Sequence, residues 1–100
     1  MKSATLIALC LAALSLALVA GGCGPVESTH LILKADTALE GARVADAEKK
    51  SPYEYVSAEQ YLHKAREKWG TSDFEYSIDY ARKAKALSEK ARERSLKPEE

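Results

Sequence analysis

The sequence predicts an all-α protein, an antiparallel helical hairpin or three-helix bundle that follows an apolar N-terminal leader. Small and apolar residues recur every three or four positions through residues 29–95, which is a helical period, and the alternation typical of strands is missing. Breaks in this pattern fall at Ser51-Pro52 and at Gly70 to Asp73. We therefore expect helices over residues 29–49, 52–69 and 73–95, inside a helical domain of residues 29–96 that ends in a tail, residues 97–100.

Residues 1–22 differ sharply from the rest of the chain. Of its 30 charged residues, only Lys2 lies in this segment, and an apolar run from Leu6 to Ala20 follows. A positive start, an apolar middle and small residues at the exit are typical of a secretory signal peptide. A membrane-spanning helix is the alternative, but it needs about 20 apolar residues, and two glycines end this run. We predict that residues 1–22 are removed.

Residues 19–23, Val-Ala-Gly-Gly-Cys, resemble the lipobox of bacterial lipoproteins. This resemblance implies cleavage after Gly22, a diacylglycerol thioether on Cys23 and acylation of the new amine, for instance by palmitate. Residues 23–28 would then be an acylated tether. Gly24 after the cysteine resembles the pattern of lipoproteins that reach the outer membrane and face the periplasm. The alternative is an ordinary thiol at Cys23, next to a generic cleavage site.

Each expected helix has an apolar face and boundary residues that suit it. The first carries Leu31, Ala35, Ala38, Ala42 and Ala45, with Leu39 beside them.

The second expected helix begins at Ser51 as N-cap with Pro52 in its first turn, and its apolar seam is Tyr55, Ala58, Leu62, Ala65 and Trp69. Gly70 is the residue expected to form a left-handed C-cap.

The third expected helix is capped by Ser72 or Asp73, and its seam is Phe74, Ser77, Ala81, Ala84, Ser88, Ala91 and Ser95. Such small residues bury little area, so we expect a thin core.

Two family resemblances follow from these breaks and stripes. Gly70 to Ala86 looks like the second half of one tetratricopeptide unit, a local likeness because repeat arrays need about three units. The lipobox cysteine, the Ala-rich first helix, the Ser51-Pro52-Tyr53 break and the Ser72-Asp73-Phe74 turn together resemble the domain-of-unknown-function family 4398. That resemblance implies a short helical lipoprotein of the bacterial cell envelope, with an OmpA-like peptidoglycan-binding protein as a candidate partner.

Catalytic, metal-binding and nucleic-acid-binding patterns are not found in the sequence. His30 and His63 lie far apart, with no cysteine to join them in a zinc site. Glu59 and Glu67 lie four residues on either side of His63, a spacing that suits a weak metal site but is more typical of a solvated row of ion pairs, so we expect no metal and no cofactor. The serines fit caps or helix seams, and none lies in a nucleophile elbow. Lys plus Arg total 15 and Asp plus Glu total 15, which excludes the basic surface that nucleic acid needs. We expect a protein that is not an enzyme.

Six aromatic residues are the candidate contact residues for a partner or a glycan: Tyr53, Tyr55, Tyr61, Trp69, Tyr76 and Tyr80. Exposed tyrosine and tryptophan favour binding, whereas the alternative is that the rings fill the core. The leading hypothesis is therefore a non-catalytic, membrane-anchored helical module that docks on an envelope protein. The competing hypothesis is a direct peptidoglycan or glycan binder, and the small-residue seam leaves a homo-oligomer open as well.

Overall fold

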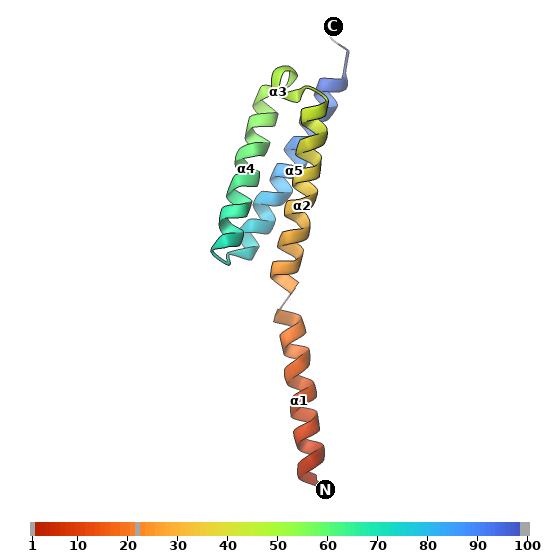
Figure 1. Cartoon of the computed structure of the whole chain (residues 1–100), viewed down its shortest axis with the longest axis vertical. Helices are drawn as coiled ribbons and strands as arrows, with labels where there is room; N and C mark the ends of the chain where they lie inside the picture. The colour runs from red at the N-terminus through yellow and green to blue at the C-terminus, as the bar shows by residue number, and fades with distance from the viewer. Residues whose placement is uncertain (1, 22, 99–100) are drawn as a thin grey trace.

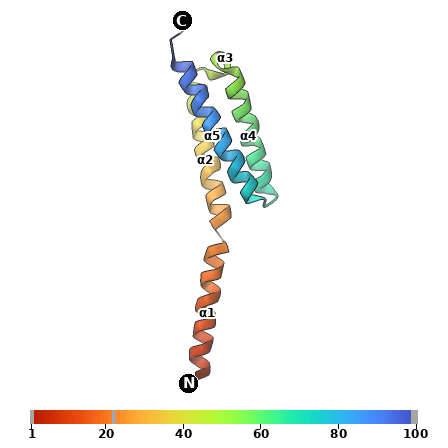
Figure 2. The same ribbon diagram turned by 180° about the vertical axis from the view of Figure 1, so that it is seen from behind.

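The computed structural model describes residues 2–21 and 23–98, and the side chains of residues 2–16 and 24–98 (Figure 1). Five helices lie within those residues: α1 (Lys2–Gly21), α2 (Cys23–Val44), α3 (Ala47–Lys50), α4 (Pro52–Gly70) and α5 (Phe74–Leu96). Helices α2, α4 and α5 form a three-helix bundle from which α1 projects (Figure 2). The molecule is elongated, 79 × 23 × 15 Å. The all-α prediction is confirmed, and of its two forms the three-helix bundle is the one found.

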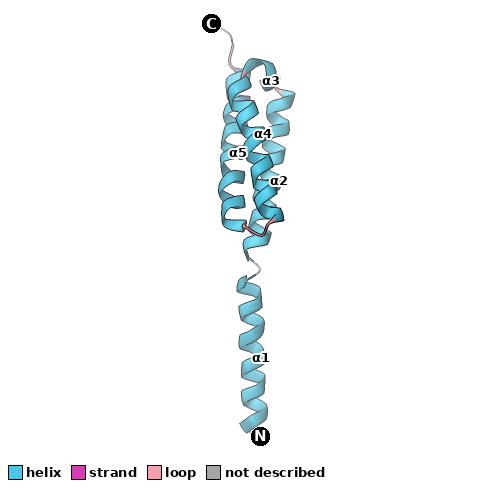
Figure 3. Cartoon of the chain, turned by 90° about the vertical axis from the view of Figure 1, so that its left-hand side faces the viewer, coloured by secondary structure: helices cyan, strands magenta, loops and turns pink. Residues whose placement is uncertain are grey.

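The three long helices alternate in direction along the chain. Helix α2 runs away from α1, α4 returns antiparallel to it, and α5 runs back beside both, so that α2 and α5 are parallel (Figure 3). Within the described residues no helix combines the length and the apolar character required for crossing a membrane.

The core is built almost entirely from small side chains. Its fully buried apolar residues include Ala35 and Ala42 of α2, Ala58 and Ala65 of α4, and three alanines of α5. Among the described residues, Leu62 is the largest side chain that is completely buried, at 2% exposure, and it packs with Ala35 and Ala84. The expected thin core is therefore observed, with Leu62 and Tyr55 as its large apolar side chains.

Serine hydroxyls fill the remaining positions of the helix seams. Ser28 Oγ on α2 donates to Ser77 Oγ on α5 at 2.6 Å, and Ser77 Oγ donates to the Ala65 carbonyl on α4 at 2.7 Å. This chain of bonds links all three helices at the end of the bundle nearest Cys23. Because the buried hydroxyls are paired, they do not carry the cost of an unsatisfied polar group.

Helix α2 begins earlier than expected, at Cys23, so that the segment predicted as a tether, residues 23–28, is helical and Ser28 is buried. Pro25 lies in the first turn of α2, where a backbone N–H has no helical partner and its loss costs nothing. Thr29 Oγ1 donates to the Pro25 carbonyl at 2.8 Å. Packing also holds this turn, because Gly24 lies against the Phe74 ring.

The first helix also ends earlier than expected, at Val44 and not near residue 49. Asp46 adopts a left-handed conformation with φ of 65°, which aspartate tolerates better than most residues, and α3 follows as a single turn. This break in the helix places Ala47 at the end of the bundle, where it packs with Ala42, Tyr55 and Ala91. Burial of Ala47 thus stabilises a break that no glycine or proline marks.

At the start of α4, Ser51 occupies the N-cap position and Pro52 the first turn, as predicted, but the Ser51 hydroxyl does not cap the backbone. It donates instead to Glu54 Oε2 at 2.6 Å, and the other carboxylate oxygen accepts a hydrogen bond from Arg94 on α5. Glu54 is only 5% exposed. The hydrogen bond from Ser51 is the main reason that the pKa of Glu54 lies below its usual value, with Arg94 adding to the effect.

The turn between α4 and α5 places its left-handed residue differently from the prediction. Gly70 ends α4 with a negative φ, and Ser72 carries the positive φ of 63°. The Asp73 amide donates to the Lys68 carbonyl at 2.9 Å and closes the turn. The left-handed residue therefore lies two positions after Gly70, the residue at which the sequence predicted it. Asp73 is the N-cap residue of α5, but its side chain accepts from Thr71 Oγ1 at 2.7 Å.

We predict that Leu62→Ala destabilises the bundle by about 2–5 kcal/mol, because it removes the largest completely buried apolar side chain from a core that cannot refill the space. Leu33→Ala is the matched control, since Leu33 is 61% exposed and its loss should change stability by less than about 0.5 kcal/mol. Urea unfolding followed by circular dichroism measures both. Equal midpoints for the two variants would contradict the role assigned to Leu62.

We predict that Glu54→Gln lowers the free energy of unfolding at neutral pH by roughly 1–3 kcal/mol, because it removes a buried charge-assisted hydrogen-bond acceptor. The folded-state pKa of Glu54 is lowered, so its stabilisation is complete above the unfolded pKa of about 4.3 and is lost as the pH falls through the folded value. Urea midpoints measured from neutral to acidic pH should therefore converge for wild type and variant. Glu40→Gln is the control, because Glu40 pairs with Arg43 on the exposed surface and should shift the midpoint little. A gap between wild type and Glu54→Gln that persists in acid would refute this account.

Candidate functional site

The residues predicted to carry the lipid lie at the junction of α1 and α2. Gly22 lies outside the described residues, and Cys23 is described only as the first residue of α2, without its side chain. Cys10, the other cysteine, is an exposed free thiol on α1. The lipidation and cleavage assignments therefore remain predictions.

The six aromatic residues do not form one site. Tyr55 was expected as a contact residue, but it is 5% exposed and belongs to the core with Ala42, Ala47 and Ala91, and this burial raises the pKa of its phenol. Tyr53 lies nearby on α4 and is 77% exposed. Tyr55 therefore fills the core and Tyr53 lies on the surface, a distinction that the helical period alone left open.

Tyr61 and Tyr80 meet on the surface shared by α4 and α5. Both are half-buried, and their ring centroids are 5.9 Å apart with an interplanar angle of 26°. Lys64 and Lys83 lie over this pair, with Nζ atoms 5.6–6.0 Å from the ring centroids. We call these four residues the tyrosine face; it combines apolar ring surface with two ammonium groups.

Trp69 and Tyr76 occupy the end of the bundle nearest Cys23. Trp69 is 46% exposed, and its Nε1 donates to Thr29 Oγ1 on α2 at 3.0 Å. Tyr76 is 59% exposed, and Lys68 Nζ lies 5.8 Å from its ring centroid. Trp69 was expected on the apolar seam of α4 with Tyr55 and Leu62, but unlike them it is largely exposed, because it lies in the last turn of the helix, where the bundle ends.

A groove with a volume of about 890 Å³ lies between the parallel helices α2 and α5. Its apolar lining includes Leu33, Ala38 and Gly41 of α2 and Leu96 of α5. Leu33 and Leu96 are each 61% exposed. We call this hollow the α2–α5 groove. Sequence reasoning missed it, although both leucines lie off the predicted apolar seams and could have indicated a second apolar surface.

Charged side chains border the α2–α5 groove on both helices. On α5, Lys85 pairs with Glu89, and Lys97, the residue that follows α5, pairs with Glu93, each at 3.6 Å. Lys34 and Arg92 also line the groove, and neither forms an ion pair with any residue that the structure describes. Two cations therefore remain available on the groove walls.

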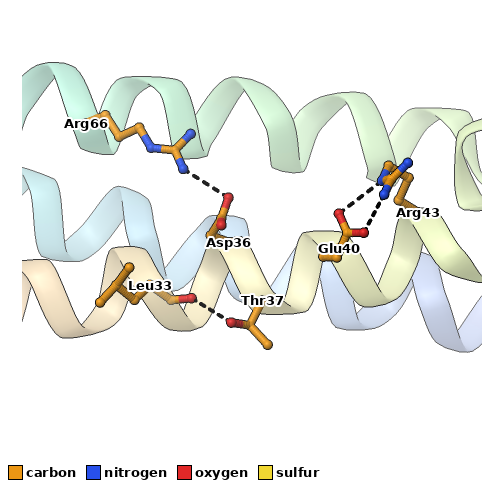
Figure 4. A network of polar contacts seen from close by, with 6 residues as sticks. All are labelled: Leu33, Asp36, Thr37, Glu40, Arg43 and Arg66. Atoms are coloured by element: carbon orange, nitrogen blue, oxygen red, sulfur yellow. Dashed lines mark hydrogen bonds and ion pairs between the residues drawn. The ribbon is translucent and has the colours of Figure 1, made fainter.

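On the side of α2 that faces α4, the acidic and basic groups are already paired. Asp36 accepts a hydrogen bond from Arg66 of α4 at 2.9 Å, and Glu40 accepts two from Arg43 one turn further along (Figure 4). The hydrogen bond from Arg43 lowers the pKa of Glu40. On this surface of α2 the charged groups already have partners, whereas the α2–α5 groove still carries unpaired charged groups.

No cluster of three or more His, Cys, Asp or Glu side chains suited to a metal ion occurs within the described ranges. His30 lines the α2–α5 groove, and His63 lies exposed on α4. The structure thus leaves the two histidines apart, on different helices.

Comparison with known proteins gives one result. No curated protein and no solved structure is significantly similar to this chain. The family described as a domain of unknown function, DUF4398, matches residues 31–97, which cover most of α2 and all of α3, α4 and α5. The chain therefore belongs to the DUF4398 family.

Proposed function

We propose that this protein is a non-catalytic lipoprotein of the bacterial cell envelope, a helical module anchored through Cys23 that docks on a partner protein. The observation that carries the docking function is the α2–α5 groove, with its exposed leucines and two unpaired cations. A bundle with so thin a core gains stability when a partner covers such apolar surface. The signal-like leader and the lipobox support the anchor and the envelope location, with the outer membrane facing the periplasm as the proposed site.

The proposed anchor is consistent with the physics of membrane attachment. Each buried acyl methylene contributes about 0.8 kcal/mol, so that two or three chains on one residue hold a protein durably at a bilayer. Helix α2 starts at Cys23 and continues directly into the bundle. Lipid on this residue would hold the bundle by one end and leave both the groove and the tyrosine face free for other contacts.

A second candidate function is direct binding of peptidoglycan glycan strands through the tyrosine face. The observation that favours it is the half-buried Tyr61–Tyr80 pair, whose rings lie side by side at a surface where a sugar ring can stack. Lys64 and Lys83 would add attraction for the carboxylates of the peptidoglycan peptide. An OmpA-like wall-binding protein as partner would instead make the contact with the wall indirect.

We predict that Cys23→Ala abolishes incorporation of labelled palmitate and leaves an unprocessed product, because no thiol remains at the lipobox position. Cys10→Ala is the matched control: it removes the other cysteine of the chain, within the leader, and should leave labelling intact. Metabolic labelling followed by membrane fractionation measures both variants. Labelling that survives in Cys23→Ala would refute the lipoprotein assignment.

The two candidate functions are separated by sedimentation of the detergent-solubilised chain with purified peptidoglycan sacculi. If docking on a protein is correct, we expect no co-sedimentation with sacculi alone. Direct glycan binding would give co-sedimentation that falls at least tenfold in Tyr61→Ala/Tyr80→Ala and is unchanged in Tyr53→Ala, whose ring is 77% exposed outside the tyrosine face. That second result would overturn protein docking as the leading function.

A further inference from the structure

We propose that the α2–α5 groove binds an acidic amphipathic helix of the partner protein, with two carboxylates seven residues apart that pair with Lys34 and Arg92. This inference rests on the proposed docking function and specifies its surface and the chemistry of its partner. It depends on the shape of the groove, the placement of its apolar residues and the spacing of its unpaired charges.

The length of the groove suits a short helix. On α2 its lining extends from His30 to Gly41, and on α5 from Lys85 to Leu96, with Lys97 just beyond the helix. At about 1.5 Å of rise per residue, each wall is about 17–18 Å long, or roughly three helical turns. Two parallel helices with a hollow of this length between them offer the seat that a further helix occupies in a four-helix bundle.

The apolar groups are distributed along the groove as a helix seat requires. Arg92 Cδ lies 3.5 Å from the position that a Cβ on Gly41 would occupy, which sets these two residues at the same height. Leu33 lies two turns before Gly41, and Leu96 lies one turn after Arg92, so that the two exposed leucines mark opposite ends. Between them Ala38 is small, which allows the backbone of an incoming helix to approach closely, whereas Gly41 is covered by the Arg92 side chain.

The two unpaired cations of the groove specify the sign and the spacing of the charges that the partner must carry. Lys34 and Gly41 are seven residues apart on α2, about 10.5 Å along the axis. Because the Arg92 side chain lies over Gly41, its positive charge is separated from Lys34 by a similar distance. A helix presents residues i and i+7 on one face at this same spacing. Lys85 and Lys97 already have partners in Glu89 and Glu93, so the groove carries an unpaired charge of two positive units.

The test measures binding of a defined helical peptide to the full chain reconstituted in nanodiscs of neutral phosphatidylcholine. The probe is a fluorescent 18-residue amphipathic peptide with one leucine stripe and two glutamates seven residues apart, and the comparison peptide carries glutamine at both positions. We expect the acidic peptide to bind the wild-type chain at least tenfold more tightly. We also expect Lys34→Glu/Arg92→Glu to weaken its binding at least tenfold, which corresponds to about 1.4 kcal/mol or more.

The matched control is Lys50→Glu/Lys90→Glu, which makes the same change of net charge at two exposed lysines outside the groove. Binding of the acidic peptide should be nearly unchanged in this variant, and circular dichroism verifies that both double variants are folded. Equal weakening in the two double variants, or equal binding of the acidic and glutamine peptides, would overturn the proposal.

A photo-crosslinking residue introduced at Thr37, inside the groove, tests a second copy as the occupant. A crosslinked homodimer that disappears in Lys34→Glu/Arg92→Glu would assign the groove to self-association and overturn the proposal. Failure of the lipid assignment is distinguishable from both results, because the palmitate label on Cys23 is read independently of peptide binding. Peptide binding without labelling would leave the groove assignment in place and remove only the anchor.

Discussion

Close approach of α5 to both neighbouring helices is the constraint on which the rest of this structure depends. Six buried residues of α5 face the other helices, and all six are serine or alanine. Seams of this kind draw helix backbones together, and they leave no room for large side chains between them. Stability must then come from many short contacts, from Leu62 and from hydroxyls that pair across the helices, as in the bond between Ser28 and Ser77.

The same constraint determines where the large side chains lie. Apart from Tyr55 and Leu62, the buried apolar residues are alanines, whereas Trp69, Tyr76, Leu33 and Leu96 are exposed on the outside of the bundle. Together with the tyrosine face, these exposed residues mark three distinct places: the surface shared by α4 and α5, the aromatic end near Cys23, and the α2–α5 groove. The surface therefore carries the chemical variety that the core lacks, and binding is the activity for which such a surface is suited.

Much of the fold follows from the sequence because small residues at helical spacing have one reasonable interpretation. All six buried positions of α5 were predicted, as were Tyr55, Leu62 and the alanines of the α4 seam. Local signals failed where distant contacts decide the outcome. The break at Asp46 depends on burial of Ala47 by α4 and α5, and the buried state of Glu54 depends on Arg94, forty residues away.

The candidate sites were harder to predict than the fold. The sequence singled out six aromatic residues, but it gave no indication that Tyr61 would meet Tyr80. The groove was missed because it is formed by residues from both ends of the bundle sequence, which become neighbours only when α5 returns beside α2.

The parallel arrangement of α2 and α5 gives their shared groove a direction. The carbonyl ends of both helices lie at the Leu96 end, and their amino ends lie near Cys23. Helix dipoles that point the same way add, so the two ends of the groove differ in potential. An occupant that runs antiparallel to α2 and α5 places its own amino end beside the carbonyl ends of both helices, where the negative ends of their dipoles favour it. The direction of the groove thus favours one orientation of a bound helix over the other.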